Sequence, residues 1–335
     1  MNKRITWIDL LRIIGMIGVL TIHIVGNTIN TLGLTGTPNL VYTVICQSFY
    51  FALPLFVMVS GSLLLSKDIS YKEIFLKYIK RMFLVLLIFG SLFTILEEYF
   101  ITKTIGIGIF GKIFNNIITG SLWDHMWYVY LMIGLYLITP LLRNYIKNSK
   151  KNELITLLVI VLIFTIIKTD LCNLFNINTA LFIPLGSNFI FAYLLGNYLY
   201  NNDLSMKSKT ILHIIGFLSF VIIIILSICN TNEFLIGYTT FLCTAVATDV
   251  YVIFKNKDIK SKKLTNLICE LGKCSFGIYI LHQLFINIVY KWLKIDFILN
   301  IPYTGLFLYV ILLLIITFIF VYVLRKIKII RNNLL

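Results

Sequence analysis

Apolar stretches of about 20 residues recur from one end of the chain to the other, separated by short segments that hold charged or turn-forming residues. Lipid offers the backbone no hydrogen-bond partner, so a continuous apolar segment of this length crosses a bilayer as a helix. The pattern therefore predicts an all-α, polytopic membrane bundle of about ten transmembrane helices. The apolar segments lie near residues 8–27, 40–65, 82–100, 124–142, 154–170, 181–200, 210–229, 234–254, 267–290 and 303–324.

The composition agrees with a membrane protein. Of the 335 residues, 59% are hydrophobic and only 13% are charged, and the mean hydropathy is +0.93. Soluble proteins have about 25% charged residues, so an ordinary soluble globule is excluded. Because the apolar segments leave no room for a soluble core, we expect residues 1–335 to form one integral-membrane domain without a second, extracytoplasmic domain. We expect a multi-pass protein of the cell membrane.

The basic residues gather on one side of the predicted bundle. The net charge of +15 would indicate a nucleic-acid partner in a soluble protein. With the N-terminus inside, 22 of the 29 Lys and Arg residues fall in cytoplasmic segments and five in outer ones, as the positive-inside rule requires. We therefore expect both termini in the cytoplasm, and membrane lipid rather than nucleic acid as a partner.

The first predicted helix contains ionisable residues, which are costly in lipid and so indicate function. Arg12 and His23 are 11 residues apart. At about 100° and 1.5 Å per residue, they lie within roughly 20° of one face and about 16 Å apart along the axis. Asp9 can pair with Arg12 one turn away. The alternatives are that Arg12 reaches lipid phosphate and that His23 is a hydrogen-bonded packing residue.

The ninth predicted helix carries a polar stripe. Ser275, Tyr279 and His282 fall within about 60° of one another, so the stripe should face the interior of the bundle. His23 and His282 each lie 15 residues from the cytoplasmic start of their segment, so both can line one cavity. Hydrogen bonding between helices is the alternative for Ser275 and Tyr279. The six cysteines form no CxxC pair, and no metal site is expected.

Polar residues at the outer helix ends are candidates for binding an acceptor. Asp124, His125 and Trp127 begin the fourth segment, and two glutamates at residues 97–98 end the third. For the tryptophan the alternative is an interfacial aromatic belt, and for the titratable residues it is a solvated loop. Ser60, in a small-residue cluster of the second segment, is a further candidate, with close helix packing as its alternative.

Four motifs, taken in order, resemble the integral-membrane acyltransferase-3 family, the O-acyltransferases of cell-surface polysaccharides and related acceptors. Arg12 and His23 resemble the family's Arg-x10-His motif. Three later stretches, LFVMVSG at 55–61, MWYV through Pro140 at 126–140 and SFGIYILH at 275–282, resemble its Phe-rich Ser-Gly, Trp-Phe-x-Tyr…Pro and late Tyr-x-x-His segments. The family often has Arg-x-x-Arg followed by Pro, where this chain reads YIKR at 78–81 and has Val85 in place of the proline.

The resemblance implies an acyltransferase of groups other than aminoacyl groups, with no bound cofactor. Its donor would be cytoplasmic acyl-CoA, expected to be acetyl-CoA, and its acceptor a hydroxyl of an envelope polysaccharide or a lipid-linked glycan. Guanidinium and ammonium groups suit the donor phosphates. The residues expected to bind acyl-CoA are Arg12 with Asp9, then Lys77, Lys80 and Arg81, and those expected to bind the acceptor are Ser60, Asp124, His125 and Trp127.

An acceptor hydroxyl is a poor nucleophile until a base removes its proton, and a neutral imidazole suits that task near pH 7. His23 is predicted as the general base, with a covalent acyl relay as the alternative. His282 and Tyr279 would orient it or stabilise the developing oxyanion. A non-catalytic transporter or flippase of acyl groups or lipid-linked sugars is a rival reading of ten helices with buried polar residues. A membrane sensor ranks last, for want of a soluble output domain.

Overall fold

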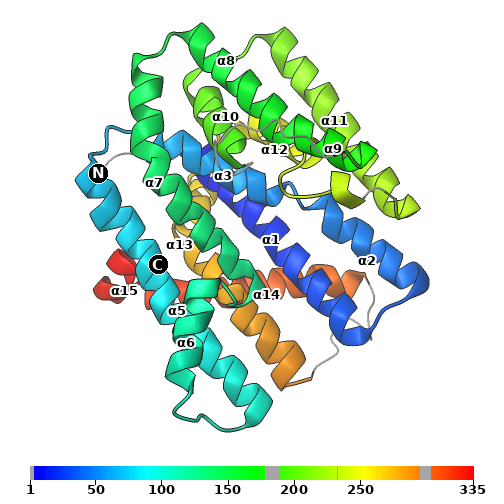
Figure 1. Cartoon of the computed structure of the whole chain (residues 1–335), viewed down its shortest axis with the longest axis vertical. Helices are drawn as coiled ribbons and strands as arrows, with labels where there is room; N and C mark the ends of the chain where they lie inside the picture. Colours follow the sequence, from blue (N-terminus) through cyan, green and yellow to red (C-terminus); the bar gives the residue numbers. More distant parts are fainter. Residues whose placement is uncertain (1–3, 178–188, 232, 295–302) are drawn as a thin grey trace. The chain divides into compact units, whose positions relative to one another are not determined.

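Helices are the only regular elements among the residues that the structure describes, which are 4–177, 189–231, 233–294 and 303–335 (Figure 1). The structure is a computed structural model, and it confirms the all-α prediction. Eight segments of the described chain are long and apolar enough to cross a membrane, so the protein is a polytopic helical membrane protein. These segments are Thr6–Leu32, Gly36–Leu64, Tyr71–Thr102, Asp124–Asn148, Lys151–Phe175, Met206–Cys229, Lys262–Trp292 and Thr304–Leu324.

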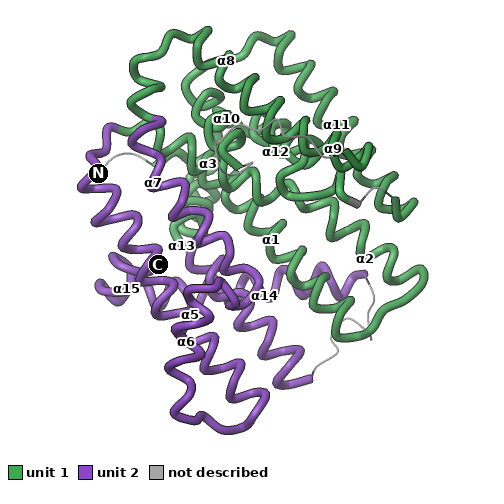
Figure 2. Tube along the Cα trace, viewed as in Figure 1, with its two compact units in different colours: residues 1–67, 143–275 green, residues 68–142, 276–335 purple. Residues whose placement is uncertain are grey.

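The chain divides into two compact units, each assembled from two separate stretches of sequence (Figure 2). Unit 1 comprises residues 1–67 and 143–275, and unit 2 comprises residues 68–142 and 276–335. Two long helices, α7 (Trp127–Asn148) and α13 (Lys262–Asn287), contribute residues to both units. The other elements of unit 1 are α1 (Thr6–Leu32), α2 (Gly36–Ser48), α3 (Ala52–Leu64), α8 (Lys151–Val161), η3 (Leu162–Ile167), α9 (Lys168–Phe175), α10 (Phe189–Asn201), α11 (Met206–Cys229), η4 (Glu233–Leu235) and α12 (Phe241–Phe254). Those of unit 2 are α4 (Tyr71–Glu73), η1 (Ile74–Ile79), α5 (Lys80–Thr102), α6 (Ile109–Thr119), η2 (Asp124–Met126), η5 (Ile288–Trp292), α14 (Thr304–Leu324) and α15 (Lys328–Asn333).

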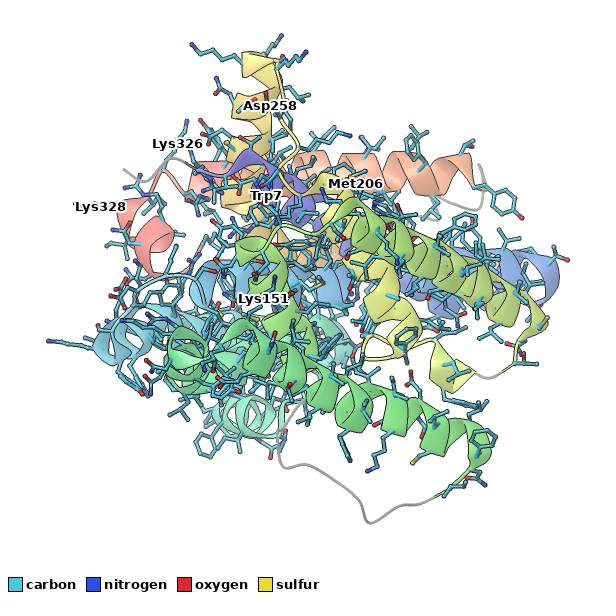
Figure 3. All side chains as sticks on the ribbon, turned by 90° about the horizontal axis from the view of Figure 1, so that it is seen from above. Trp7, Lys151, Met206, Asp258, Lys326 and Lys328 are labelled. Atoms are coloured by element: carbon cyan, nitrogen blue, oxygen red, sulfur yellow. The ribbon has the colours of Figure 1, made fainter. Side chains whose placement is uncertain are left out.

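Helix α1 lies at the core of unit 1, where it packs against α2, α3 and α12. Most of its side chains are buried, and small residues let its neighbours come close. An ideal Cβ on Gly18 would lie 2.7 Å from the Cβ of Ala52 in α3. Trp7, labelled in Figure 3, packs edge-on against the ring of Tyr251 with centroids 5.7 Å apart. The first helix is therefore fixed by tight packing rather than by contact with lipid alone.

Two glycines allow α3 and α10 to touch backbone to backbone. An ideal Cβ on Gly61 would lie 1.9 Å from the carbonyl oxygen of Tyr193, and one on Gly196 would lie 2.0 Å from that of Met58. The buried Ser62 hydroxyl lies 2.9 Å from the Gly196 carbonyl oxygen and 2.7 Å from a tyrosine hydroxyl of α12. Small residues thus serve close helix packing here, as they do in other membrane bundles.

Helix α12 corrects the predicted segment 234–254. It has 14 residues, or about 21 Å, against about 30 Å of hydrocarbon. The Phe241 N–H at its start donates to the Asp170 carboxylate of α9 over 2.8 Å. Lys255 at its end pairs with Asp203, which follows α10, over 3.0 Å. The helix therefore connects the first turn of α9 to the segment after α10. The predicted segment 181–200 lies partly outside the described residues.

In unit 2, α6 folds back along α5, in a stretch where the sequence pattern predicts no helix. Lys112 pairs with Glu98, and the Asn116 amide lies 3.4 Å from the Thr94 hydroxyl. At Gly90 of α5, an added Cβ would lie close to side chains of α6 and of the segment that follows it. From Glu98 to Gly90 the contacts run along about 12 Å of α5, at 1.5 Å per residue. The chain then turns at Gly120, whose φ is +74°, and enters η2.

Candidate active site

Two arginines converge on one carboxylate at the beginning of α1. Arg12 Nη1 lies 2.9 Å from Asp9 Oδ1, which confirms the pair predicted from their spacing. Arg4, which precedes the helix, binds the same carboxylate through Nε at 2.7 Å and Nη2 at 2.5 Å. The Asp9 side chain is 2% exposed, whereas those of Arg12 and Arg4 are 26% and 35% exposed. The Arg4–Asp9–Arg12 cluster therefore presents two partly exposed cations around one buried anion.

Helix α13 packs closely against this cluster, and Arg4 in the cluster keeps its charge. An ideal Cβ at Gly272 of α13 would lie 2.5 Å from Asp9 Oδ1, so only glycine leaves room for the carboxylate. The hydrogen bond to Asp9 raises the pKa of Arg4 above its ordinary value, and Arg4 stays protonated throughout the physiological range. Guanidinium groups held in place by a carboxylate, with net positive charge, suit an anionic group such as a phosphate.

His23 lies on α1 between largely buried neighbours. Its side chain is partly exposed, as that of Arg12 is, and most other residues between these two are buried. The Asn27 amide donates to the His23 carbonyl oxygen over 2.8 Å, one turn further along the helix. A partly exposed imidazole on a well-packed helix can meet a ligand without a change in backbone conformation.

Unit 2 holds a buried cluster of His125, Tyr279 and His282. The Tyr279 hydroxyl donates to the His125 carbonyl oxygen, and His125 Nε2 lies 3.0 Å from the Ile280 carbonyl oxygen. These two bonds run in opposite directions and join η2 to α13. The His282 ring lies 5.0 Å from the His125 ring between centroids, and its Nδ1 is 2.6 Å from the Tyr279 carbonyl oxygen. Both histidines are 0% exposed.

The burial of His125 overturns the solvated loop as a reading of this residue. Its neighbours behave as expected at a helix end, because Asp124 is exposed and Trp127 is 36% exposed. His125 is buried, unlike these two neighbours, because α6 returns the chain along α5 and η2 then reaches α13. The local sequence does not encode that return.

An aromatic and polar layer adjoins the buried histidines. Phe93 of α5 stacks on Trp123 with ring centroids 4.2 Å apart and lies 5.7 Å from the His125 ring. The Trp123 indole N–H donates to Glu97 over 3.1 Å, and Lys291 binds the same carboxylate over 2.9 Å. Glu97 is therefore an ion-pair partner and a hydrogen-bond acceptor rather than a solvated loop charge.

The three basic residues predicted to bind the donor with Arg12 have different surroundings in unit 2. Lys77 is exposed and pairs with Glu73 over 3.2 Å, and Lys80 is also exposed. Arg81 is partly buried: its guanidinium lies 5.0 Å from the centroid of the Phe276 ring, and its Nε donates to the Leu334 carbonyl oxygen over 3.3 Å. Two further lysines, Lys326 just before α15 and Lys328 at its start, are labelled in Figure 3, and both are exposed.

Ser60 is the remaining residue predicted to bind substrate. Its hydroxyl donates to the Phe56 carbonyl oxygen of the same helix over 2.9 Å, and its side chain is partly exposed. His23 and Ser60 belong to unit 1, whereas His282 and Tyr279 belong to unit 2. A cavity shared by the two histidines of α1 and α13 therefore stays a prediction.

Sequence reasoning missed Arg4 and the pairing of His125 with His282. Arg4 precedes the helix, so helical periodicity does not link it to Asp9. A basic residue five positions before a buried acidic residue was nevertheless a sequence feature that could have indicated the pair. The His125 carbonyl oxygen accepts a hydrogen bond from Tyr279, which lies 154 positions away in the sequence. No sequence motif marks the turn that brings His125 there.

The apolar spans of the described chain define a helical membrane protein. Residues 5–326 match the family described as an acyltransferase domain, and the chain belongs to this acyltransferase-3 family. The protein is therefore a membrane acyltransferase, which transfers groups other than aminoacyl groups, and not a non-catalytic carrier. No curated protein and no solved structure matches the chain significantly.

Proposed function

We propose that this acyltransferase transfers an acyl group, expected to be acetyl, from cytoplasmic acyl-CoA to a hydroxyl of a cell-envelope glycan or its lipid-linked precursor. The proposal places the enzyme in the cell membrane, with the donor arriving from the cytoplasm. The observation that carries it is the Arg4–Asp9–Arg12 cluster at the start of the helix that also holds His23.

The cluster supports an acyl-CoA donor through its charge. Coenzyme A is rich in phosphate, and a guanidinium binds phosphate oxygens through two parallel hydrogen bonds. Asp9 holds Arg12 and Arg4 in place, so less conformational freedom is lost when the donor binds. Arg12 therefore binds a phosphate of the donor, and Arg4 adds a second cation.

His23 is the general base of this proposal. It lies about 16 Å beyond Arg12 along the helix, a distance that the long arm of the donor can span. His23 takes the proton from the acceptor hydroxyl as the oxygen attacks the thioester carbonyl. The C–O bond forms, the C–S bond breaks, and the CoA thiolate leaves to be protonated.

The test uses the purified full-length protein with radiolabelled acetyl-CoA and an envelope oligosaccharide. We expect label in an ester on the sugar, and we expect His23→Gln to lower its rate of formation at least about 100-fold, the usual contribution of a general base. His213→Gln is the matched control, since His213 pairs with Asp249 on α11 and α12 and is placed in no catalytic role. Undiminished transfer by folded His23→Gln protein would remove His23 from the mechanism. Absence of any ester with the unchanged protein would reject the donor or the acceptor.

A further inference from the structure

The C-terminal part of α1 is open on one face and buried on the other. Around the helix axis, at about 100° per residue, Asn27 and Asn30 lie within about 40° of His23. His23 and Asn27 are partly exposed and Asn30 is exposed. Ile24 and Val25, which point the other way, are 0% exposed. The open face therefore continues from His23 toward the end of the helix.

Gly26 adds space to this open face. It lies about 60° from His23 around the helix, and no atom of the described residues lies within 4 Å of an ideal Cβ at this position. The two earlier glycines of α1 differ, because a Cβ on Gly15 or Gly18 would lie within 3.1 or 2.7 Å of a side chain of α3. Close packing explains those two glycines but not Gly26. Glycine weakens a helix relative to alanine, so room for a ligand beside His23 accounts for Gly26 better.

Helix α1 is long enough to bring this face to a membrane surface. Its 27 residues span about 40 Å, against about 30 Å of hydrocarbon. Arg12 lies near the beginning of the helix, so Asn27 and Asn30 lie near the opposite surface. With the N-terminus inside, as the sequence predicts, that surface is the outer one. A glycan of the cell envelope approaches from this side.

The side chains on the open face suit a neutral sugar. An amide group both donates and accepts hydrogen bonds, as a sugar hydroxyl does. The Asn27 amide donates to the His23 carbonyl oxygen over 2.8 Å, which holds this side chain against the helix. Residues 23–32, HIVGNTINTL, include no Asp, Glu, Lys or Arg. The face therefore favours a ligand with hydroxyl groups over a charged one.

We propose that His23, Gly26, Asn27 and Asn30 form the binding site for the acceptor sugar. The proposal rests on the proposed function, in which His23 takes the proton of the acceptor hydroxyl. The sugar ring lies over Gly26, and Asn27 binds a hydroxyl next to the reacting one. Asn30, about 10 Å beyond His23 along the axis, binds the next sugar of the glycan. The donor and acceptor sites then lie at opposite ends of one helix.

The first experiment fills the open space. Gly26→Leu adds a side chain where nothing of the described chain lies within 4 Å, and leucine favours a helix more than glycine does. We expect this variant to unfold at the same temperature as the unchanged protein or higher. Its KM for an envelope oligosaccharide should rise at least about tenfold, while its KM for acetyl-CoA stays unchanged. Gly111→Leu on α6, at another open helical glycine, is the matched control and should change neither constant.

The second experiment removes the amide groups. Asn27→Ala and Asn30→Ala should each raise KM for the oligosaccharide about 2–10-fold, the effect of one hydrogen bond, and leave KM for acetyl-CoA unchanged. Asn148→Ala on α7 is the matched control. Its amide also donates to the carbonyl oxygen four residues earlier, over 2.8 Å, so it reports the effect of losing such a bond elsewhere.

A binding measurement separates this site from the proposed function. Without acyl-CoA, the oligosaccharide should raise the Tm of the unchanged protein in detergent and not that of Gly26→Leu. If it does so but no ester forms from acetyl-CoA, the proposed donor has failed and the acceptor site stands. If the unchanged protein is neither stabilised nor active, the glycan is not the acceptor and both proposals fail.

Two results with folded Gly26→Leu protein would overturn the site by itself. One is an unchanged KM for the oligosaccharide, and the other is a rise in Tm with the oligosaccharide equal to that of the unchanged protein. An equal rise in KM for both substrates would also contradict it, because a bulky residue at Gly26 should block only the acceptor.

Discussion

Replacement of Arg12 by lysine tests whether a guanidinium, and not merely a positive charge, is needed at the start of α1. Lysine cannot form two parallel hydrogen bonds to a phosphate while it also binds Asp9. We expect Arg12→Lys to raise KM for acyl-CoA about tenfold with little change in kcat, the signature of an interaction present before and during the reaction. Steady-state kinetics with labelled acyl-CoA measures both constants. Arg331→Lys, at an exposed position on α15, is the matched control, and an unchanged KM in Arg12→Lys would exclude Arg12 from donor binding.

At the scale of single residues, the sequence predicts contacts within one helix better than contacts between helices. The Asp9–Arg12 pair follows from a separation of three residues, and the structure confirms it. The burial of Ser275, Tyr279 and His282 also agrees with the predicted inward-facing stripe. The partner of His282 is different, because His125 reaches it only through the fold of α5, α6 and η2. That contact depends on tertiary packing, which a local pattern does not contain.

At the scale of elements, the contact between α3 and α10 is the most demanding in packing. An added Cβ at Gly196 would lie 2.0 Å from a backbone oxygen, which cannot move without shifting α3. We expect Gly196→Ala to lower the free energy of unfolding by about 1–3 kcal/mol, the usual cost of overpacking. Thermal unfolding in detergent measures the change. Gly134→Ala on α7, where an added Cβ meets nothing within 4 Å, is the control. Equal stability of Gly196→Ala and the unchanged protein would show that the two helices can separate at little cost.

The ends of elements were harder to predict than their existence. The third span begins at Tyr71 rather than near residue 82, because basic residues at its N-terminal end interrupt the apolar run while the helix continues through η1. Helix α6 has 11 residues, too few to register as a crossing, and it packs along α5 instead. Charge and length therefore identify what can cross lipid, but not where a helix stops or which helices fold back.

At the scale of the whole molecule, two short helices decide which side of the membrane α11 faces. If only the eight long segments cross and the N-terminus is inside, α11 begins outside and ends inside. If α10 and α12 also cross, both ends of α11 are reversed. The first arrangement would place Asp203 and Lys255 on opposite sides, yet their side chains lie 3.0 Å apart. The ion pair within unit 1 therefore favours the ten crossings predicted from the sequence over the eight long segments alone, and ten crossings stay a prediction.

Cysteine labelling on intact cells tests this topology. Lys207 and Asn230 flank α11 at opposite ends, and both are exposed. In a full-length background with Cys172, Cys229 and Cys269 changed to serine, we expect a membrane-impermeant maleimide to label Asn230→Cys in intact cells. It should label Lys207→Cys only after the membrane is opened. Basic residues near a membrane are retained on the cytoplasmic side, and the ion pair after α12 fixes the same side for the start of α11. The reverse labelling pattern would leave α12 as a helix that does not cross, and it would place the Asp203–Lys255 contact in conflict with the membrane.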